Sequence, residues 1–265
     1  MRIWKTVALS MIALVAIATT RPVVAGEPSG LKLLCGEGTP LKAGTKIALF
    51  GDSITMQGGY IRTINAALEA SAHTKDLDVK LFQHGLNGGR VPTVLDGKSP
   101  WGNLGGTMQE LIEKESPDLV VIFLGVNDVW HGEKGTSPED FAAGLRTMVE
   151  MCKKAGARVV LASLAVIGEK PDGSNAHDAK LDRYTAITLK VAKETESTPL
   201  NVRKFFLDRL KAANTEKDER GQYAGKGILT YDGVHTSDKG NDLLANLFGG
   251  AIVEALKKPS PVGPK

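Results

Sequence analysis

Three side chains of this 265-residue sequence have the types and spacing of a serine nucleophile system. Ser53 follows a short apolar run, and Asp232 precedes His235 by three residues near the other end of the chain. A serine hydroxyl is a weak nucleophile at neutral pH, so an imidazole must take its proton during attack. A carboxylate beside the histidine can bond the second ring nitrogen and stabilise the imidazolium. We therefore expect Ser53 as nucleophile, His235 as base and Asp232 as the group that orients the base.

Attack by a serine places negative charge on a carbonyl oxygen, and hydrogen-bond donors must stabilise that charge. The candidate donors are the backbone N–H of Ser53, the backbone N–H of Gly88 and the side-chain amide of Asn127. Losing one such donor typically costs about 100- to 1,000-fold in rate. The sequence thus predicts an attacking group together with the groups that would hold the oxyanion.

Each of these residues must be positioned by the element that precedes it. Apolar runs predict strands over residues 46–50, 79–82, 118–124, 158–162 and 199–202. Amphipathic patterns and capping residues predict helices over residues 60–72, 138–155, 178–193 and 237–256. Strands that alternate with helices indicate one α/β domain, with a parallel sheet covered on both faces. Since chemistry collects at the carboxyl ends of such strands, we expect the candidate residues to share one edge of the sheet.

Four short blocks, in their order along the chain, resemble the SGNH, or GDSL-type, hydrolase superfamily. The blocks are Gly51-Asp52-Ser53, the glycine-rich segment 85–90, Gly125-Val126-Asn127-Asp128 and Asp232-Gly233-Val234-His235. The resemblance covers residues 46–257 and implies a three-layer α/β/α fold with a five-stranded parallel sheet, similar to flavodoxin.

The resemblance also implies roles for individual residues. It implies Ser53, Asp232 and His235 as the catalytic residues, with Ser53, Gly88 and Asn127 around the oxyanion. It implies no cofactor and no metal ion. The second block departs from many relatives, which have Asp or Ser-Thr after the glycine. Gly85 and Gly89 therefore remain alternatives to Gly88.

The first 25 residues have the pattern of a secretory signal peptide. Arg2 and Lys5 precede an uncharged apolar run, and Val23-Val24-Ala25 supplies small residues for cleavage before Gly26. The run is short for a membrane span, and an uncleaved N-terminal anchor is the alternative interpretation. We therefore expect a secreted or periplasmic protein that has no stable membrane insertion.

The expected cleavage divides the chain into a signal segment, a loose extension over residues 26–45, the domain over 46–257 and a Pro-rich, disordered tail over 258–265. The formal charge of +3 comes from the signal segment, which carries three basic residues and no acidic residue. The rest is formally neutral, so we expect no nucleic-acid partner. Cys35 and Cys152 are the only cysteines, and their pairing stays open because the sequence does not give their separation.

Two tryptophans, Trp101 and Trp130, lie in segments beyond the predicted strands. A flat aromatic face beside polar groups suits a sugar ring, whereas a tryptophan that packs its own loop is the alternative. We expect an esterase that hydrolyses short-chain esters, acetyl above all, of a small-molecule or polysaccharide alcohol. The alternatives are a lipase, lysophospholipase or thioesterase of the same superfamily, a non-catalytic carbohydrate-binding domain, and a phosphatase or metal-dependent hydrolase.

Overall fold

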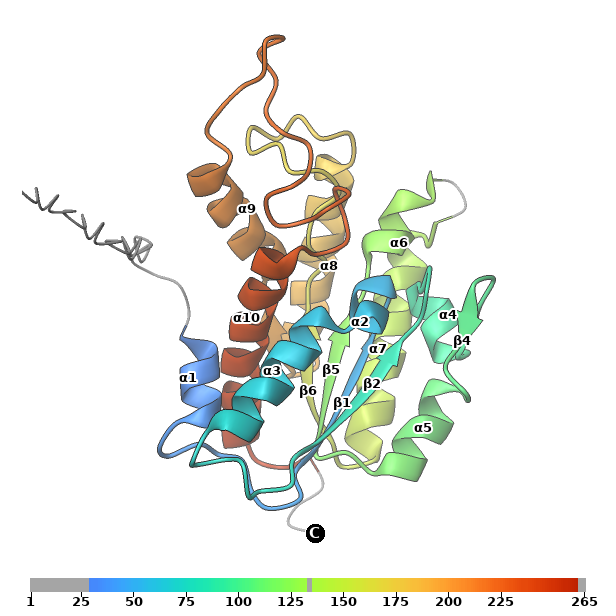
Figure 1. Ribbon diagram of the computed structural model, residues 1–265. Coiled ribbons are helices and arrows are strands. Elements are labelled where there is room, and N and C mark those ends of the chain that lie inside the picture. The colour runs from blue at the N-terminus through green and yellow to red at the C-terminus, as the bar shows by residue number, and fades with distance from the viewer. Residues whose placement is uncertain (1–28, 133–134, 262–265) are drawn as a thin grey trace, which may run out of the picture.

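A five-stranded parallel sheet forms the centre of the computed structural model, which describes residues 29–132 and 135–261 (Figure 1). Its strands lie in the order β2, β1, β5, β6, β7, all parallel to their neighbours. Their bounds are Lys80–Gly85 for β2, Lys46–Gly51 for β1, Leu119–Phe123 for β5, Arg158–Ala162 for β6 and Thr198–Leu200 for β7. The chain order reverses between β1 and β5, and ligands bind at such switch points in open α/β sheets.

Helices cover both faces of this sheet, which makes three layers (Figure 1). One face is covered by α1 (Gly30–Cys35), α3 (Gly59–Ala70), α9 (Val202–Ala213) and α10 (Asp238–Lys257). The other is covered by α4 (Val91–Leu95), α5 (Met108–Glu115), α7 (Pro138–Lys154) and α8 (Asp178–Glu194). Successive strand residues point to opposite faces, so Leu49 packs in the first layer and Phe50 in the second. Burial on both faces explains why the strands are continuously apolar.

Short elements at the carboxyl edge of the sheet complete the fold. The helices α2 (Ser53–Gln57) and α6 (Val126–Trp130) follow β1 and β5 directly. A small antiparallel hairpin is formed by β3 (Lys98–Ser99) and β4 (Gly102–Asn103). The long loops 163–177 and 214–237 rise from the same end of the molecule (Figure 1). The predicted active-site blocks therefore meet at this edge.

The predicted α/β architecture is confirmed, with all five predicted strands and four predicted helices present within a few residues of their expected bounds. The stretch expected to be loose contains α1, where Leu34 is fully buried and Gly30 lies against the backbone of α10. The tail is also attached at its start, because Arg158 Nε donates to the carbonyl of Lys258 at 2.8 Å. The predicted signal segment and residues 262–265 lie outside the described residues.

The two cysteines are free and lie on opposite faces of the sheet. Cys35 packs in the layer of α10, whereas Cys152 is fully buried in the layer of α7. A disulfide requires Cα atoms within about 7 Å, and the sheet separates these two residues. The question left open by the sequence is therefore answered against the bridge. In the part of the chain that the structure describes, no helix has the length and apolar character needed to cross a membrane.

Candidate active site

Ser53, His235 and Asp232 form one line of hydrogen bonds at the carboxyl edge of the sheet. Ser53 Oγ lies 2.9 Å from His235 Nε2, and His235 Nδ1 lies 2.6 Å from Asp232 Oδ2. Residues 182 positions apart in the chain are thus in direct contact. This geometry lets the imidazole accept the serine proton at one nitrogen while the carboxylate holds the other.

Asp232 is fixed by its own turn as well as by the imidazole. Its Oδ1 accepts the backbone N–H groups of Val234 at 2.9 Å and His235 at 2.8 Å. Partial burial pushes the pKa of Asp232 upward. The hydrogen bonds from the His235 ring and from the two N–H groups outweigh burial, and hold that pKa below its usual range. The carboxylate is therefore ionised at neutral pH and can stabilise an imidazolium.

The candidate oxyanion donors come from three different elements around Ser53. Ser53 is the first residue of α2, so its backbone N–H has no partner within that helix. The Asn127 amide donates one N–H to the carbonyl of Gly89 at 3.1 Å, and an amide has a second N–H to offer. Asn127 is thereby held beside the glycine-rich block.

The three glycines left open by the sequence differ in their surroundings. The N–H of Gly89 already donates to the carbonyl of Leu86 at 2.8 Å, which closes a tight turn. Gly85 ends β2, and a Cβ there would lie 2.0 Å from the backbone nitrogen of Met56. Gly88 has φ +63°, and a Cβ on it would lie 2.1 Å from the ring of Trp101. Only glycine fits this position without displacing the tryptophan.

Two buried carboxyl groups are sequence neighbours of candidate residues: Asp52 precedes Ser53, and Asp128 follows Asn127. Asp52 caps α2, where its Oδ1 accepts the N–H of Ile54 at 2.9 Å, and burial raises its pKa to about 7. Asp128 is fully buried and accepts the N–H of Val91 at 3.1 Å, and burial raises its pKa to about 6. Both side chains bond backbone groups, so their geometry is that of structural supports.

Trp101 lies at the tip of the β3–β4 hairpin, directly over Gly88. The hairpin is tied to the glycine-rich block because Ser99 Oγ donates to the carbonyl of Asn87 at 2.6 Å. The Trp101 ring stacks on His131, with centroids 5.8 Å apart and planes at 16°. Although Trp101 packs against Gly88 and His131, its side chain is 59% exposed. Trp130, at the end of α6, is 44% exposed.

Sequence reasoning missed a third aromatic ring at this edge. Tyr231 stacks on the His235 ring at 5.8 Å and 15°, and its hydroxyl accepts an N–H from Gln57 at 2.8 Å. Tyr231 is 54% exposed. Its position immediately before Asp232 was the available signal, because a residue next to the Asp232–His235 turn must lie near the His235 ring.

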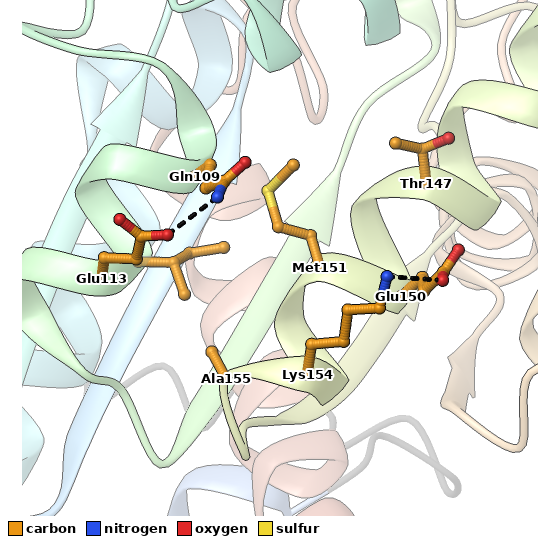
Figure 2. A pocket seen from close by; sticks show the side chains of 8 residues that line it. Gln109, Glu113, Thr147, Glu150, Met151, Lys154 and Ala155 are labelled. Atoms are coloured by element: carbon orange, nitrogen blue, oxygen red, sulfur yellow. Dashed lines mark hydrogen bonds and ion pairs between the residues drawn. The ribbon is translucent and has the colours of Figure 1, made fainter.

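A hollow of about 430 Å³ lies away from these residues, between α5 and α7 (Figure 2). Its walls carry two local pairs, Gln109 with Glu113 and Lys154 with Glu150, each at 2.8 Å (Figure 2). The ends of α5 and α7 lead into the first residues of β5 and β6, so the hollow faces the amino edge of the sheet. None of Ser53, Asp232 and His235 lines it. In the described part of the chain, no three His, Cys, Asp or Glu side chains gather closely enough to hold a metal ion.

Comparison with known proteins places the chain among esterases. Residues 49–243 match the GDSL-like Lipase/Acylhydrolase family. An acetylxylan esterase of Geobacillus stearothermophilus is 26% identical over 229 residues, which cover 78% of this chain and 93% of that protein. An arylesterase of Vibrio mimicus is 30% identical over 128 residues, which cover 47% of this chain and 57% of that protein. The crystal structure of the acetyl xylan esterase AlAXEase is 30% identical, with a TM-score of 0.65 over 78% of this chain and 99% of that one.

The matched segment runs from β1 into α10 and contains every candidate active-site residue named above. Both the family and its esterase relatives identify the chain as a carboxylic ester hydrolase. Because the match extends over more than half of its length, this chain belongs to the GDSL-like lipase/acylhydrolase family.

Proposed function

We propose that this chain is an exported serine esterase that removes short acyl groups, acetyl above all, from carbohydrate esters. The observation that carries the proposal is the pair of bonds at 2.9 Å and 2.6 Å joining Ser53, His235 and Asp232. Two of the relatives, each matched over 78% of this chain, are described as acetylxylan esterases. Their substrate supports the choice of acetyl group and of a sugar alcohol.

The first half of the reaction transfers the acyl group to the serine. Ser53 Oγ attacks the ester carbonyl while its proton passes to His235 Nε2, and Asp232 stabilises the imidazolium. The oxyanion accepts hydrogen bonds from the N–H groups of Ser53 and Gly88 and from the Asn127 amide. When the intermediate collapses, the bond to the sugar oxygen breaks. His235 gives its proton to that oxygen, so the sugar leaves with a free hydroxyl.

The second half returns the enzyme to its starting state. A water molecule gives a proton to His235 as it attacks the acyl-Ser53 carbonyl, and the same donors hold the second oxyanion. Collapse breaks the bond to Ser53 Oγ and releases acetic acid as acetate and a proton. His235 returns its proton to the serine. Every proton transfer in both halves uses the single Nε2 atom that faces Ser53.

The surface around Ser53 supports a sugar rather than a lipid as the alcohol. In the described residues five large hydrophobic side chains are exposed, and four of them stand at the carboxyl edge of the sheet. These four are Met56, Trp101, Trp130 and Tyr231. Three are aromatic, and their flat faces lie among polar groups such as Gln57 and His131. Such faces suit a sugar ring, which has an apolar face and a polar rim.

The direct test compares wild type with Ser53→Ala on nitrophenyl esters of increasing acyl length and on acetylated xylan. We expect the acetyl ester to be cleaved fastest, and Ser53→Ala to lose turnover by ~1,000-fold or more at an unchanged melting temperature. A fluorophosphonate probe should label wild type once and leave the variant unlabelled. Faster cleavage of the octanoyl ester would favour a lipase, and turnover retained by Ser53→Ala would assign the nucleophile elsewhere.

Export is tested separately. If the 25-residue signal segment is removed during export, the protein made in its own host begins at Gly26. N-terminal sequencing of that protein measures this directly, and a retained Met1 would contradict export by cleavage.

A further inference from the structure

Glu169, in the loop that follows β6, is a fully buried carboxylate surrounded by donors from one distant segment. Its Oε1 accepts the N–H of Leu229 at 2.7 Å and both the N–H and the hydroxyl of Thr230 at 2.5 and 2.8 Å. Its Oε2 accepts the N–H of Ile228 at 2.8 Å. Four donors therefore converge on a single side chain, 59 to 61 residues away in sequence.

A carboxylate is the side chain that this arrangement requires. Three successive backbone N–H groups pointing to one place form a concave anion site. A carboxylate presents only acceptors and can satisfy all of these donors at once. Hydrogen bonds to an ionised acceptor are also roughly twice as strong as neutral ones. Buried N–H groups left unpaired would cost free energy, so removing the carboxylate would release the segment 228–230.

The main chain around Glu169 is bonded to the same part of the molecule. The N–H of Glu169 donates to the carbonyl of Gly225 at 3.0 Å, and the N–H of Gly168 donates to the carbonyl of Gly233 at 2.7 Å. The Asn214 amide donates to the carbonyl of Glu169 at 2.8 Å. The loop after β6 is thus hydrogen-bonded to the segment that carries Asp232 and His235, through backbone groups as well as side chains.

Thr230 connects this anchor to the catalytic turn. Its hydroxyl donates to Glu169 and accepts the N–H of Gly233 at 3.1 Å. Gly233 lies between Asp232 and His235 and has φ +101°, a conformation that other residues rarely adopt. A second hydrogen bond closes the turn, because the N–H of Tyr231 donates to the carbonyl of His235 at 3.0 Å.

We propose that Glu169 is a positioning residue for the esterase reaction, which holds His235 against Ser53 by way of the Thr230 hydroxyl. The inference rests on the proposed function, because it takes His235 as the base. Glu169 bonds neither Ser53 nor the His235 ring and therefore acts through another residue. The hydrogen bonds from Glu169 to Thr230 and from Thr230 to Gly233 control the position of the imidazole and leave substrate binding unaffected.

The test uses Thr230→Val, which removes the hydroxyl but keeps the shape and the backbone N–H. We expect kcat for an aryl acetate to fall about tenfold, with KM within about twofold, since a well-placed general base contributes ~100- to 10,000-fold. Labelling of Ser53 by a fluorophosphonate should slow by the same factor, because it needs the same base. Thr230→Ser keeps the hydroxyl and should retain the wild-type kcat.

A matched control separates position from fold stability. Thr74 is also buried, and its hydroxyl donates to the carbonyl of Leu68 at 2.7 Å, far from the site in the connection between α3 and β2. Thr74→Val should lower the melting temperature and leave kcat unchanged. In Thr230→Val the low-field NMR resonance of the His235 Nδ1 proton should shift or broaden, which a stability effect alone would not cause.

Each outcome decides between the two proposals. If Ser53→Ala loses turnover but Thr230→Val keeps the wild-type kcat and labelling rate, the positioning role of Glu169 is wrong and the esterase mechanism stands. If Ser53→Ala keeps its turnover, the mechanism itself fails. Equal losses in Thr230→Val and Thr230→Ser would assign the effect to packing. Should Thr230→Val fail to fold, Glu169→Gln places an amide N–H against the N–H of Ile228, and a wild-type kcat in that variant would overturn the inference.

Discussion

The Asn127 side-chain amide is one of the three proposed oxyanion donors. One N–H is bonded to the Gly89 carbonyl at 3.1 Å, and this bond fixes the direction of the second. Asn127→Asp removes both donors without changing the shape of the side chain. We expect kcat to fall by about 100- to 1,000-fold while KM changes little, the pattern of an interaction made in the transition state. Steady-state kinetics on an aryl acetate measures both, and equal changes in the two constants would indicate an ordinary substrate contact.

Asp52, the neighbour of Ser53, predicts a pH dependence of stability. Burial raises its pKa to about 7 in the folded protein, whereas an unfolded aspartate titrates near ~3.9. The folded state therefore holds more protons between these values, and the contribution of Asp52 to stability falls as pH rises through that window. Above pH 7 the contribution no longer changes, and the stability lost across the window is on the order of 4 kcal/mol.

The variant Asp52→Asn isolates this effect, because asparagine does not titrate and still caps α2 through its oxygen. We expect the free energy of unfolding of the variant, relative to wild type, to rise between pH 4 and pH 7. Urea unfolding at three pH values across this range measures the difference. A difference that stays constant would show that Asp52 keeps its charge when it is buried.

The sequence could indicate that Ser53, Asp232 and His235 belong together because their signals are local. The spacing of Asp232 and His235 and the position of Ser53 after an apolar run are visible in the sequence. Glu169 gave no such signal, since its partners lie about sixty residues further along and their backbone N–H groups carry no side-chain identity. A carboxylate in a loop is ordinarily solvated, and only the folded structure shows that this one is buried.

At the level of elements, the sequence predicts the strands whose two faces are both buried. The predicted and observed bounds of β6 are identical, because every residue from Arg158 to Ala162 packs against a helix or a neighbouring strand. The end of β2 was missed because it is an edge strand with Gln83 and His84 in it. Polar residues on an edge strand break the apolar pattern on which the prediction depends.

Helix α9 anchors the loop that carries Glu169 through one buried cation. Arg203 is 2% exposed and bonds Asp178 at 2.9 Å, at the start of α8. Its guanidinium also donates to the carbonyl of Ala165 at 3.4 Å, within the loop itself. The cation therefore joins both ends of the 163–177 loop to a helix on the other face of the sheet.

Replacing this cation should be costly, because it leaves the buried carboxylate of Asp178 without its cationic partner. We expect Arg203→Met to lower the free energy of unfolding by about 3–5 kcal/mol. Lys204→Met is the control on the same helix, since Lys204 and Asp208 form an exposed pair at 2.5 Å and its loss should cost less than ~0.5 kcal/mol. Denaturant unfolding measures both variants. The added substitution Asp178→Asn should recover part of the loss, and no recovery would argue against a buried-charge effect.

Across the whole molecule, the two apolar layers are separate from the edge of the sheet that carries Ser53, Asp232 and His235. Each face of the sheet has its own core, and neither core includes Ser53, Asp232 or His235. The four exposed hydrophobic side chains around Ser53 belong to loops and short helices beyond the strands. Substitutions at these positions should change how substrate binds without weakening either core. The substrate preference of the enzyme can therefore be tested independently of its stability.

Trp101 is the position at which this separation is tested most directly. If its ring holds the sugar of an acetylated xylo-oligosaccharide, Trp101→Ala should lower kcat/KM on that substrate by about fivefold, corresponding to ~1 kcal/mol for one aromatic contact. Trp101→Phe keeps a flat face over Gly88 and should lose less. Cleavage of nitrophenyl acetate, which has no sugar, should change by less than about twofold in both variants. Equal losses on the two substrates would mean that Trp101 supports the Gly88 turn that it covers, and that the sugar binds elsewhere on the edge.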